Sequence, residues 1–284
     1  MSVPRHPSRA DRLLAAAALS VALLGCSSTE SVGPTTPATE TTAGTTTTPA
    51  ATAPATSTTT TVAATTTAPP ITTPATAPPA QVVVPAGTPD WAAVAAGIGP
   101  LALPSDCPLP LGQPGLMPNS DRSYRGGVHQ GIDFVCMEYG HVATLPLPGR
   151  VLLAVTDYVE PSKEDRDAIL EEAQQLGATP PYTLEFLFGR FVVIDHGVVE
   201  GVGHVVSVYA HLAEVDPAVR PGVALAAGAV VGHIGNSGTE TAAIGGTRPQ
   251  SIHLHWELHI NDVPFSTGLD ERATAAVVAQ LFGA

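Results

Sequence analysis

Residues 252–258 read IHLHWEL, and this stretch decides the fold. Its branched and aromatic residues favour a β-strand, on which residues two apart project to the same face. His253 and His255 therefore lie side by side on one face of the predicted strand. A pair of imidazoles on one face of a sheet is a candidate metal or catalytic site.

A second stretch, HQGID at residues 129–133, adds His129 and Asp133. In extended backbone both lie on one face, and Gly131 between them leaves room for a metal close to the backbone. Two imidazoles and one carboxylate are a common catalytic zinc set, which leaves the fourth position to a water whose pKa falls to roughly 7. With His211 in VYAHL, two imidazoles remain to take a proton and to stabilise an oxyanion.

Three motifs in this order, HQGID, YAHL (209–212) and HLHWE (253–257), resemble those of the lysostaphin/LytM-type zinc endopeptidases of bacterial cell walls. GRFVVIDHG before YAHL and VVGHIGNSG after it fit the same family pattern. The resemblance covers about residues 108–268. It implies a duplicated hybrid motif: a compact β-sheet core whose groove holds the metal.

The resemblance also assigns roles to five residues. It implies that His129, Asp133 and His255 hold one zinc ion, and that His211 and His253 are the catalytic histidines. It implies hydrolysis of peptide bonds in peptidoglycan stems or cross-bridges.

The segment SYRGGVH places two more polar residues ahead of the first ligand. Tyr124 and Arg125 are candidates for contact with the oxyanion or with a substrate carboxylate.

The N-terminus indicates an exported protein. Arg5, Arg9 and Arg12 precede an apolar stretch of signal-peptide length over residues 13–24. The sequence LLGC at 23–26 resembles a lipobox, so residues 1–25 are predicted to be a lipoprotein signal peptide and Cys26 the lipidated residue. Lipid there would anchor the chain to the outer face of the bacterial membrane, in the cell-wall space. The alternative is an ordinary secretory signal with a chance cysteine.

The chain then divides by composition. Residues 26–85 are rich in Thr, Ala and Pro and have few large apolar side chains, which predicts a disordered linker. Residues 86–284 can form one metallopeptidase domain with a substantial core. The net charge of −13, with Lys163 as the single lysine, excludes a basic nucleic-acid footprint.

Cys107 and Cys136 remain once Cys26 is lipidated. An extracytoplasmic compartment favours a disulfide between them, which would pin the loop before HQGID to the strand that carries Asp133. The alternative is two separate buried thiols.

The predicted fold is mainly β, a compact antiparallel sheet with one groove. Residues 162–176 are predicted to form an inserted helix with a cap at Ser162 and a stop at Gly177, and a short C-terminal helix is predicted after Asp270. The inserted helix is a wall or lid of the groove, a docking surface for another protein, or a plain cover of the sheet. The loop 239–251 is expected to border the site. Predicted strands are PGRVLLAVT (148–156), FLFGRFVVID (186–195), VVSVYAHL (205–212), AVVGHIG (229–235) and HLHWELHI (253–260).

Three classes of function follow from these patterns. The first is a zinc endopeptidase that cuts peptidoglycan peptides. The second is a catalytically silent relative that binds the wall or activates another hydrolase; such relatives typically lose ligands, whereas this chain keeps all five residues. The third is a lipoprotein adhesin or envelope spacer, which would need neither metal motif.

Overall fold

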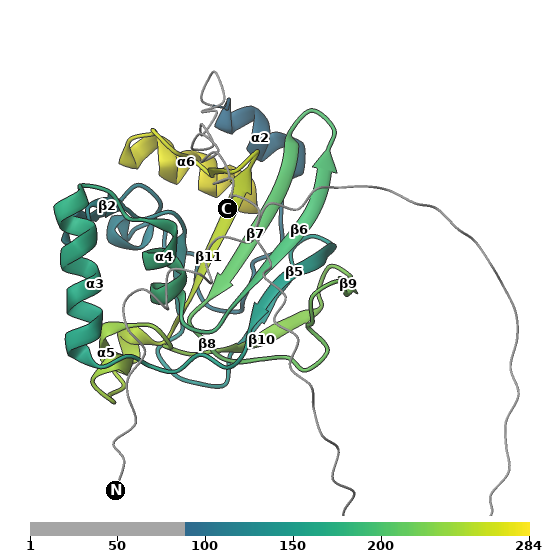
Figure 1. The fold of residues 1–284 in the computed structure, drawn as a ribbon. Coiled ribbons are helices and arrows are strands. Elements are labelled where there is room, and N and C mark those ends of the chain that lie inside the picture. Colours follow the sequence, from purple (N-terminus) through teal and green to yellow (C-terminus); the bar gives the residue numbers. More distant parts are fainter. Residues whose placement is uncertain (1–88) are drawn as a thin grey trace, which may run out of the picture. The chain divides into compact units, whose positions relative to one another are not determined.

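An antiparallel sheet forms the centre of the molecule (Figure 1). The computed structural model describes residues 89–284, so the predicted signal peptide, Cys26 and all of the predicted linker lie outside the described residues. The main sheet has seven strands: β3 pairs with β11, and the others follow the order β12-β11-β7-β6-β5-β9. Their bounds are β3 (Ile132–Val135), β5 (Gly149–Val155), β6 (Phe191–Val199), β7 (Gly203–Ala210), β9 (Ala224–Leu225), β11 (His253–Ile260) and β12 (Val263–Pro264).

Two smaller antiparallel sheets accompany the main sheet. One has the order β4-β10-β8, and the other pairs β1 with β2. The mainly β fold predicted from the sequence is confirmed. The bounds are β1 (Asp121–Arg122), β2 (Gly127–Val128), β4 (Val142–Thr144), β8 (Leu212–Val215) and β10 (Val230–Ile234).

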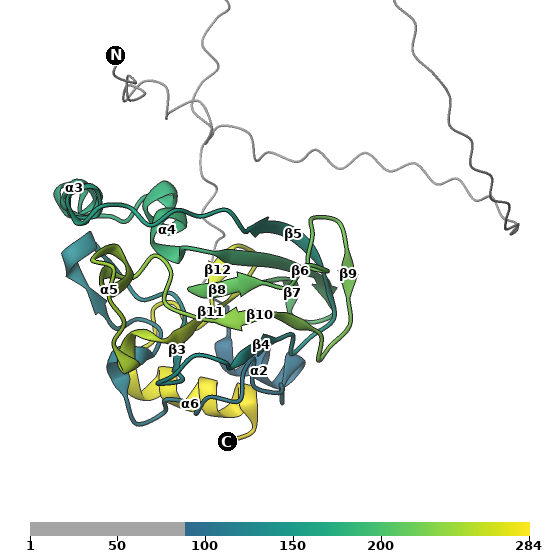
Figure 2. The same cartoon turned by 90° about the horizontal axis from the view of Figure 1, so that it is seen from below.

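The helices gather in two groups (Figures 1 and 2). Helices α2 (Trp91–Ile98) and α6 (Glu271–Phe282) lie together, and Gln280 donates to the Ala92 carbonyl between them. Helices α3 (Lys163–Leu176), α4 (Pro181–Phe188) and α5 (Glu240–Ala243) form the second group. Three short 3-10 turns are η1 (Pro114–Leu116), η2 (Ser123–Arg125) and η3 (Pro249–Ser251).

The strand β11 separates the core from the candidate site. Leu254, Trp256 and Leu258 are at most 2% exposed and face the core. The ring of Trp256 lies 5.7 Å from that of Phe282 in α6, so this helix covers the apolar face of the strand. Because side chains alternate along a strand, His253 and His255 face the opposite side.

The inserted helix has the predicted bounds. The Ser162 hydroxyl accepts from the Asp165 amide, and Gly177 ends α3 with a φ of 66°, a conformation that favours glycine. Leu170 and Ala173 are buried, but Leu176 is 62% exposed. The packing face of α3 therefore ends before the last residue of the helix, which turns toward solvent.

One predicted strand is partly wrong. Residues 186–188 belong to α4, and β6 starts only at Phe191. Pro181 occupies the first helical position, where a missing amide hydrogen has no cost, and Gly189 with a φ of 70° ends the helix. The apolar residues FLF fit a strand or a short helix equally well, so periodicity alone misassigned them.

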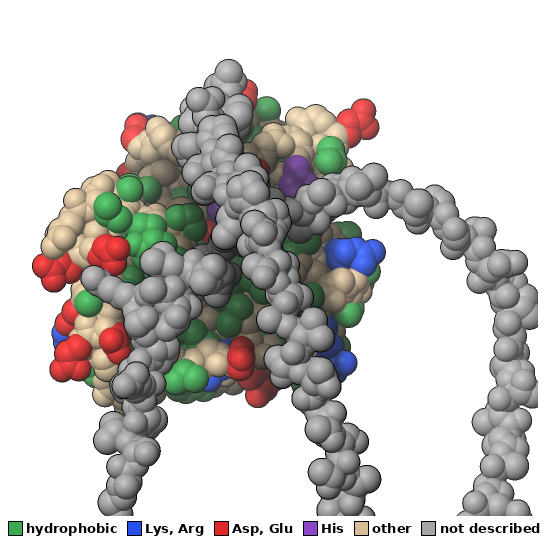
Figure 3. All heavy atoms as spheres, viewed as in Figure 1, with side chains coloured by type: hydrophobic (Ala, Val, Ile, Leu, Met, Phe, Trp, Pro, Cys, Tyr) green, Lys and Arg blue, Asp and Glu red, His purple; other side chains and the backbone are tan. Residues whose placement is uncertain are grey.

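The surface is acidic on the side of the molecule where α3 lies (Figure 3). This helix carries Glu164, Asp165, Asp167, Glu171 and Glu172. Among residues 89–284, no helix has the length and apolar character that crossing a membrane requires.

Candidate metal centre

Three donor atoms converge on the polar face of β3 and β11. The Nε2 atom of His129 lies 3.0 Å from Oδ1 of Asp133 and 3.0 Å from Nδ1 of His255. The Asp133 oxygen lies 2.9 Å from the same nitrogen of His255. Sheet register explains one side of this triangle, because Asp133 and His255 are directly opposite each other on paired strands.

Both imidazoles of the triangle bind an acceptor through the outer nitrogen and turn the other nitrogen inward, where it can hold a metal. His129 donates from Nδ1 to the carbonyl of Met117 at 3.0 Å, and His255 donates from Nε2 to Glu257 at 2.8 Å. A carbonyl and a carboxylate only accept, so these outer nitrogens carry the protons. The inner nitrogens and the Asp133 oxygen are then three electron-pair donors within 3.0 Å of one another, an arrangement that needs a cation or a proton between them.

The spacing of this donor set suits zinc. Ligands at 2.0–2.1 Å from a tetrahedral ion are about 3.3 Å apart, close to the sides of the triangle. All three residues are buried, with exposed fractions of 3% for His129, 7% for Asp133 and 6% for His255. Two nitrogens and one oxygen are also a donor set that zinc accepts in catalytic sites.

The backbone of HQGID differs from the predicted extended form. His129 lies outside the strands, the chain bends at Gly131, and β3 starts only at Ile132, just before Asp133. A Cβ on Gly131 would lie 2.5 Å from the carbonyl oxygen of Trp256 and 2.9 Å from the His255 ring. Glycine is required here because β11 approaches closely. The sequence suggested another reason for a glycine at this position, room for a metal close to the backbone, and that reason is the less important of the two.

Without a metal, the three side chains of the triangle differ in how readily they hold a proton. Burial alone would raise the pKa of Asp133, but the imidazoles of His129 and His253 and hydrogen bonds from the ring nitrogens hold it well below its usual value. Burial lowers the pKa of His129. Burial also opposes a proton on His255, yet its hydrogen bonds to Asp133 and Glu257 raise its pKa to about 9. In metal-free protein, therefore, a proton on His255 provides the positive charge.

Behind His255 the same face of β11 continues with two more polar residues. Glu257 is 2% exposed; one oxygen accepts from His255 and the other accepts from Nε2 of His259 at 2.7 Å. Burial would raise the pKa of this carboxyl, but the two histidine hydrogen bonds lower it. Glu257 fixes the ring orientation of His255, a role that the two-residue period of the strand could have indicated.

The remaining two predicted histidines stand next to the triangle. The ring centroids of His211 and His253 are 4.5 Å apart, and Nε2 of His253 lies 3.8 Å from Oδ1 of Asp133. His211 donates from Nδ1 to the Ser237 carbonyl at 2.8 Å, and His253 donates from Nδ1 to the Ser251 carbonyl at 3.0 Å. Both rings therefore keep Nε2 unprotonated.

Burial reinforces the neutral state of these two rings. It is the main cause that lowers the pKa of His253, and it lowers the pKa of His211 well below the usual value together with the neighbouring His253 and His255. Neutral imidazoles beside a metal site can accept protons near pH 7.

His211 holds an unusual backbone conformation between β7 and β8. Its φ is 61°, a left-handed conformation that costs a residue other than glycine on the order of 1 kcal/mol. Its amide donates to the carbonyl of Phe188, the last residue of α4, at 2.8 Å. The neighbouring turn is tight as well, since a Cβ on Gly189 would lie 2.4 Å from Ser237. Residues 156–190, the insertion between β5 and β6 that carries α3 and α4, therefore contribute to the placement of His211.

The four histidines and Asp133 open into one cavity of about 230 Å³. Its walls come from the insertion between β5 and β6, from η2 with its neighbour Arg122, and from the residues that follow β10. The predicted border at 239–251 is present as Thr239 and Glu240. The lining residues other than the histidines and Asp133 are Arg122, Tyr124, Arg125, Arg166, Leu184, Leu187, Phe188, Gly238, Thr239 and Glu240.

Tyr124 and Arg125 both line this cavity, in different settings. Tyr124 is 48% exposed, whereas Arg125 is 5% exposed and donates to the Val128 carbonyl at 3.0 Å. Burial lowers the pKa of Arg125. Sequence reasoning missed Arg122, whose guanidinium lies 3.5 Å from Oδ2 of Asp133 and leaves Oδ1 to face the histidines. No local pattern links these two residues, so the sequence offered no signal for the pair.

Two further histidines of the described part, His196 and His233, contact groups outside the cavity. The ring nitrogens of His196 contact the Pro148 carbonyl and the Ser207 hydroxyl. His233 pairs with Glu214.

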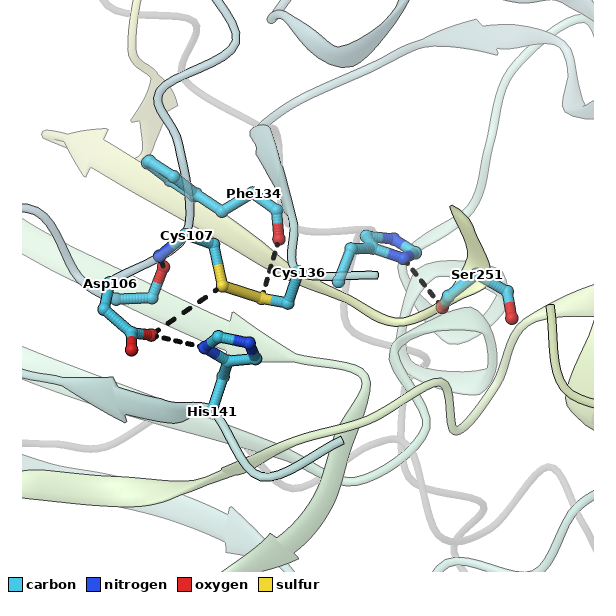
Figure 4. Close-up of a disulfide and its surroundings, with 8 residues drawn as sticks. Asp106, Cys107, Phe134, Cys136, His141 and Ser251 are labelled. Carbon is cyan, nitrogen blue, oxygen red and sulfur yellow. Dashed lines mark hydrogen bonds and ion pairs between the residues drawn. A yellow bond between two sulfur atoms is a disulfide. The ribbon is translucent and has the colours of Figure 1, made fainter. Parts of the chain in front are cut away.

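Cys107 and Cys136 form a disulfide (Figure 4). Cys136 directly follows β3, and its amide donates to the Ile252 carbonyl at 3.0 Å, one residue before His253. The bond thus ties the loop before the site to the strands that carry Asp133 and His253.

Residues 178–267 match the profile of peptidase family M23. This M23 segment begins just before α4, ends just after β12 and contains His211, His253 and His255. His129 and Asp133 precede it, so the match covers one of the three converging donors. No curated protein matches the chain.

Solved structures resemble the chain over about half or two thirds of its length. A candidate peptidase M23 from Pseudomonas aeruginosa is 24% identical, with 65% of this chain and 51% of that chain aligned and a TM-score of 0.36. A zinc-containing peptidase from Vibrio cholerae is 19% identical, with 49% and 29% aligned and a TM-score of 0.30. The catalytic domain of lysostaphin from Staphylococcus simulans is 20% identical, with 53% and 81% aligned and a TM-score of 0.31. The chain thus spans about half the length of the Pseudomonas aeruginosa protein and less than a third of the length of the Vibrio cholerae protein.

Proposed function

We propose that this chain is a zinc-dependent endopeptidase that hydrolyses peptide bonds in peptidoglycan stems or cross-bridges. The observation that carries the proposal is the triangle of donors, which places three possible metal ligands, on His129, Asp133 and His255, within 3.0 Å of one another. Two further neutral imidazoles share its cavity, and the M23 segment contains three of the four histidines. The choice of peptidoglycan comes from the ordered motifs HQGID, YAHL and HLHWE.

His129, Asp133 and His255 would hold one zinc ion. When bound, zinc supplies Lewis acidity, which polarises a carbonyl group and lowers the pKa of water to roughly 7. Glu257 accepts the Nε2 proton of His255, so Nδ1 is the nitrogen that faces the metal, and Arg122 engages the second oxygen of Asp133. The residues around the triangle thus orient its donors toward a metal ion, which would displace the proton that His255 carries in its absence.

His211 and His253 would move the protons. Each has its Nδ1 proton bound to a backbone carbonyl, so Nε2 is free to take a proton from the attacking water. The ring that takes this proton becomes a donor, able to stabilise the oxyanion and then to protonate the leaving amine. Tyr124, which is half exposed in the same cavity, is a second candidate donor to the oxyanion.

Zinc content and wall lysis measured on the same preparations would test the proposal. We expect the full chain to hold one zinc ion and to release peptide fragments from purified peptidoglycan. His255→Ala should lose the metal, whereas His253→Ala should keep it and lose about 10²–10⁴-fold in turnover. His233→Ala, which removes a histidine outside the cavity, is the matched control and should behave as wild type.

Two outcomes would overturn the proposal. A chain that binds no metal removes its basis. A chain that binds zinc but cleaves nothing would instead act as a silent wall-binding protein or an activator of another hydrolase. In that case the exposed acidic face of α3 is the surface we would propose for a protein partner.

We also propose that the protein works outside the cytoplasm, anchored to the outer face of the membrane by lipid on Cys26. The lipobox-like LLGC sequence supports the anchor, and a disulfide is a feature of oxidising compartments. Labelling cells with a fatty-acid probe should mark the chain, and Cys26→Ser should abolish the label. An unlabelled wild-type protein released into the medium would contradict the anchor.

A further inference from the structure

The cavity concentrates positive charge in an acidic chain. The sequence has 12 Lys and Arg against 25 Asp and Glu, yet three arginines line this one cavity. The carboxylates that line it are Asp133, which belongs to the donor triangle, and Glu240. Once a divalent ion occupies the triangle, the positive excess becomes larger.

Two of the three arginines have no anionic partner in the part of the chain that the structure describes. Arg122 lies beside Asp133, but no carboxylate of residues 89–284 pairs with Arg125 or Arg166. Nη1 of Arg125 and Nε of Arg166 are both buried and have no hydrogen-bond partner there. Arg125 is 5% exposed and donates to the Val128 carbonyl from Nη2, whereas Arg166 is half-buried. Each leaves one buried N–H group without a partner, which makes both guanidinium groups candidates for a bound anion.

Two acidic side chains share the surroundings of Arg166, and neither forms an ion pair with it. Glu160 accepts the Gly238 amide hydrogen with both oxygens at 3.1 Å. Glu240 lines the same cavity without forming an ion pair to Arg166. The guanidinium of Arg166 therefore stays available to a ligand that enters the cavity.

The insertion places this arginine firmly against the site. Thr179, just after α3, donates to the Arg125 carbonyl at 2.8 Å. Gly126 allows close approach, since a Cβ there would lie 2.6 Å from the carbonyl oxygen of Ala173 in α3. Helix α3 is thus attached to the η2 wall, and α4 adds an apolar surface of Leu184, Leu187 and Phe188 to the same cavity.

We propose that the cavity selects peptides that carry a free carboxylate beside the scissile bond, with Arg166 as the residue that binds it and Arg125 as a second positive charge in the same cavity. This inference rests on the proposed function and deepens it. Arginine binds carboxylates through paired hydrogen bonds, and a neutral cross-bridge of glycine alone offers no such group. At about 230 Å³ the cavity is smaller than most small-molecule pockets, so it suits one or two residues of a peptide.

Matched peptides would test this selectivity in the zinc-loaded full chain. In the first pair, the residue after the scissile bond is the last of the peptide, and it ends in an α-carboxylate or in the corresponding carboxamide. A second pair is amidated at its end and carries a side-chain carboxylate or carboxamide beside the scissile bond. We expect kcat/KM to favour the acid over the amide by about 10- to 100-fold in one pair, mostly through KM. The pair that shows the preference identifies the source of the carboxylate.

Variants on the same helix separate recognition from folding. Arg166→Met should reduce the acid-to-amide ratio to within about threefold, and Arg166→Lys should retain part of it. Lys163→Met removes an exposed cation from the first turn of α3 and should keep the wild-type ratio. Equal cleavage of acid and amide by wild type in both pairs would overturn the inference, as would an unchanged ratio in Arg166→Met.

Equilibrium binding of the same peptides distinguishes this inference from the proposed function. If the zinc-loaded chain cleaves neither pair but binds the acid more tightly, and Arg166→Met loses this difference, the carboxylate site stands and the endopeptidase proposal fails. If cleavage occurs without any acid preference, the endopeptidase proposal stands and the carboxylate site fails.

Discussion

The floor and the walls of the cavity are built by different means. The floor consists of β3 and β11, where strand register and the two-residue period set the side chains; the turns before β3 and after β7 add His129 and His211. The walls come from residues 156–190, from η2 with Arg122, and from residues 238–240, segments that are mostly short helices and turns. The difference suggests that groups for chemistry are placed on the rigid sheet, and groups for selectivity on segments that can vary without disturbing it.

Removing the disulfide should weaken the floor most. The bond closes a loop with a sequence separation of 29 residues, for which chain entropy predicts about 3–4 kcal/mol of stabilisation. We expect the double variant Cys107→Ala, Cys136→Ala to lose about this much in urea unfolding. Reduced wild type serves as the control and should unfold at the same urea concentration. A loss below about 1 kcal/mol would show that the sheet needs no such tie.

Glu257→Ala should weaken the floor by a smaller amount and more locally. Without this carboxylate the His255 ring loses the group that fixes its orientation, so zinc affinity should fall about 10- to 100-fold. Competition with a fluorescent chelator measures the change. Glu214→Ala is the matched control, because this glutamate also pairs with a histidine but lies outside the cavity. Equal affinities in the two variants would rule out a positioning role for Glu257.

Without metal, the free energy of unfolding of the protein should be largest near pH 6.5. Below this pH the unfolded chain binds protons that buried His129, His211 and His253 resist, because their pKa values are lowered, so stability falls as pH falls. Between pH 6.5 and about 9 the folded chain keeps the proton on His255, so stability falls as pH rises, by up to about 1.4 kcal/mol per pH unit.

Urea unfolding at pH 5.5, 6.5 and 8.5, with chelator and with zinc, measures this profile. Zinc should replace the proton on His255 and remove the alkaline decline. Metal-free protein that is as stable at pH 8.5 as at pH 6.5 would contradict the assignment.

Ser162→Ala should destabilise the wall helix α3 alone, and its effect should be the smallest of those predicted here. Loss of an N-cap costs about 1 kcal/mol, so amide exchange in α3 should become about fivefold faster. Exchange in β11 should be unchanged, which provides the control within the same sample. Faster exchange in both elements would show that wall and floor open together.

Local signals predicted much of the floor and the ends of the helices. The alternation in IHLHWEL indicated which face of β11 carries the histidines, and Ser162 and Gly177 marked the ends of α3. These predictions hold because strand period and capping act over a few residues. The helix α4 was misassigned because its eight residues are too short to show a helical period.

Contacts between distant segments could not be predicted. Arg122 meets Asp133, and Arg166 reaches the cavity, only because the chain folds β1 and the insertion against the same sheet. Gly131 was noted from the sequence, but its reason, the carbonyl of Trp256, lies on a strand far along the chain. Sequence reasoning thus found the chemical groups and missed what surrounds them.

The alternation along β11 has a consequence for how this gene can change. His253, His255, Glu257 and His259 share one face, and Leu254, Trp256, Leu258 and Ile260 share the other. Replacing any one of them alters one group. A codon gained or lost within the strand would exchange the faces from that point onward, bringing tryptophan and leucine to the cavity and imidazoles to the core. Related sequences should therefore differ in this strand by substitutions and almost never by insertions or deletions, whereas the wall segments are free to differ in length.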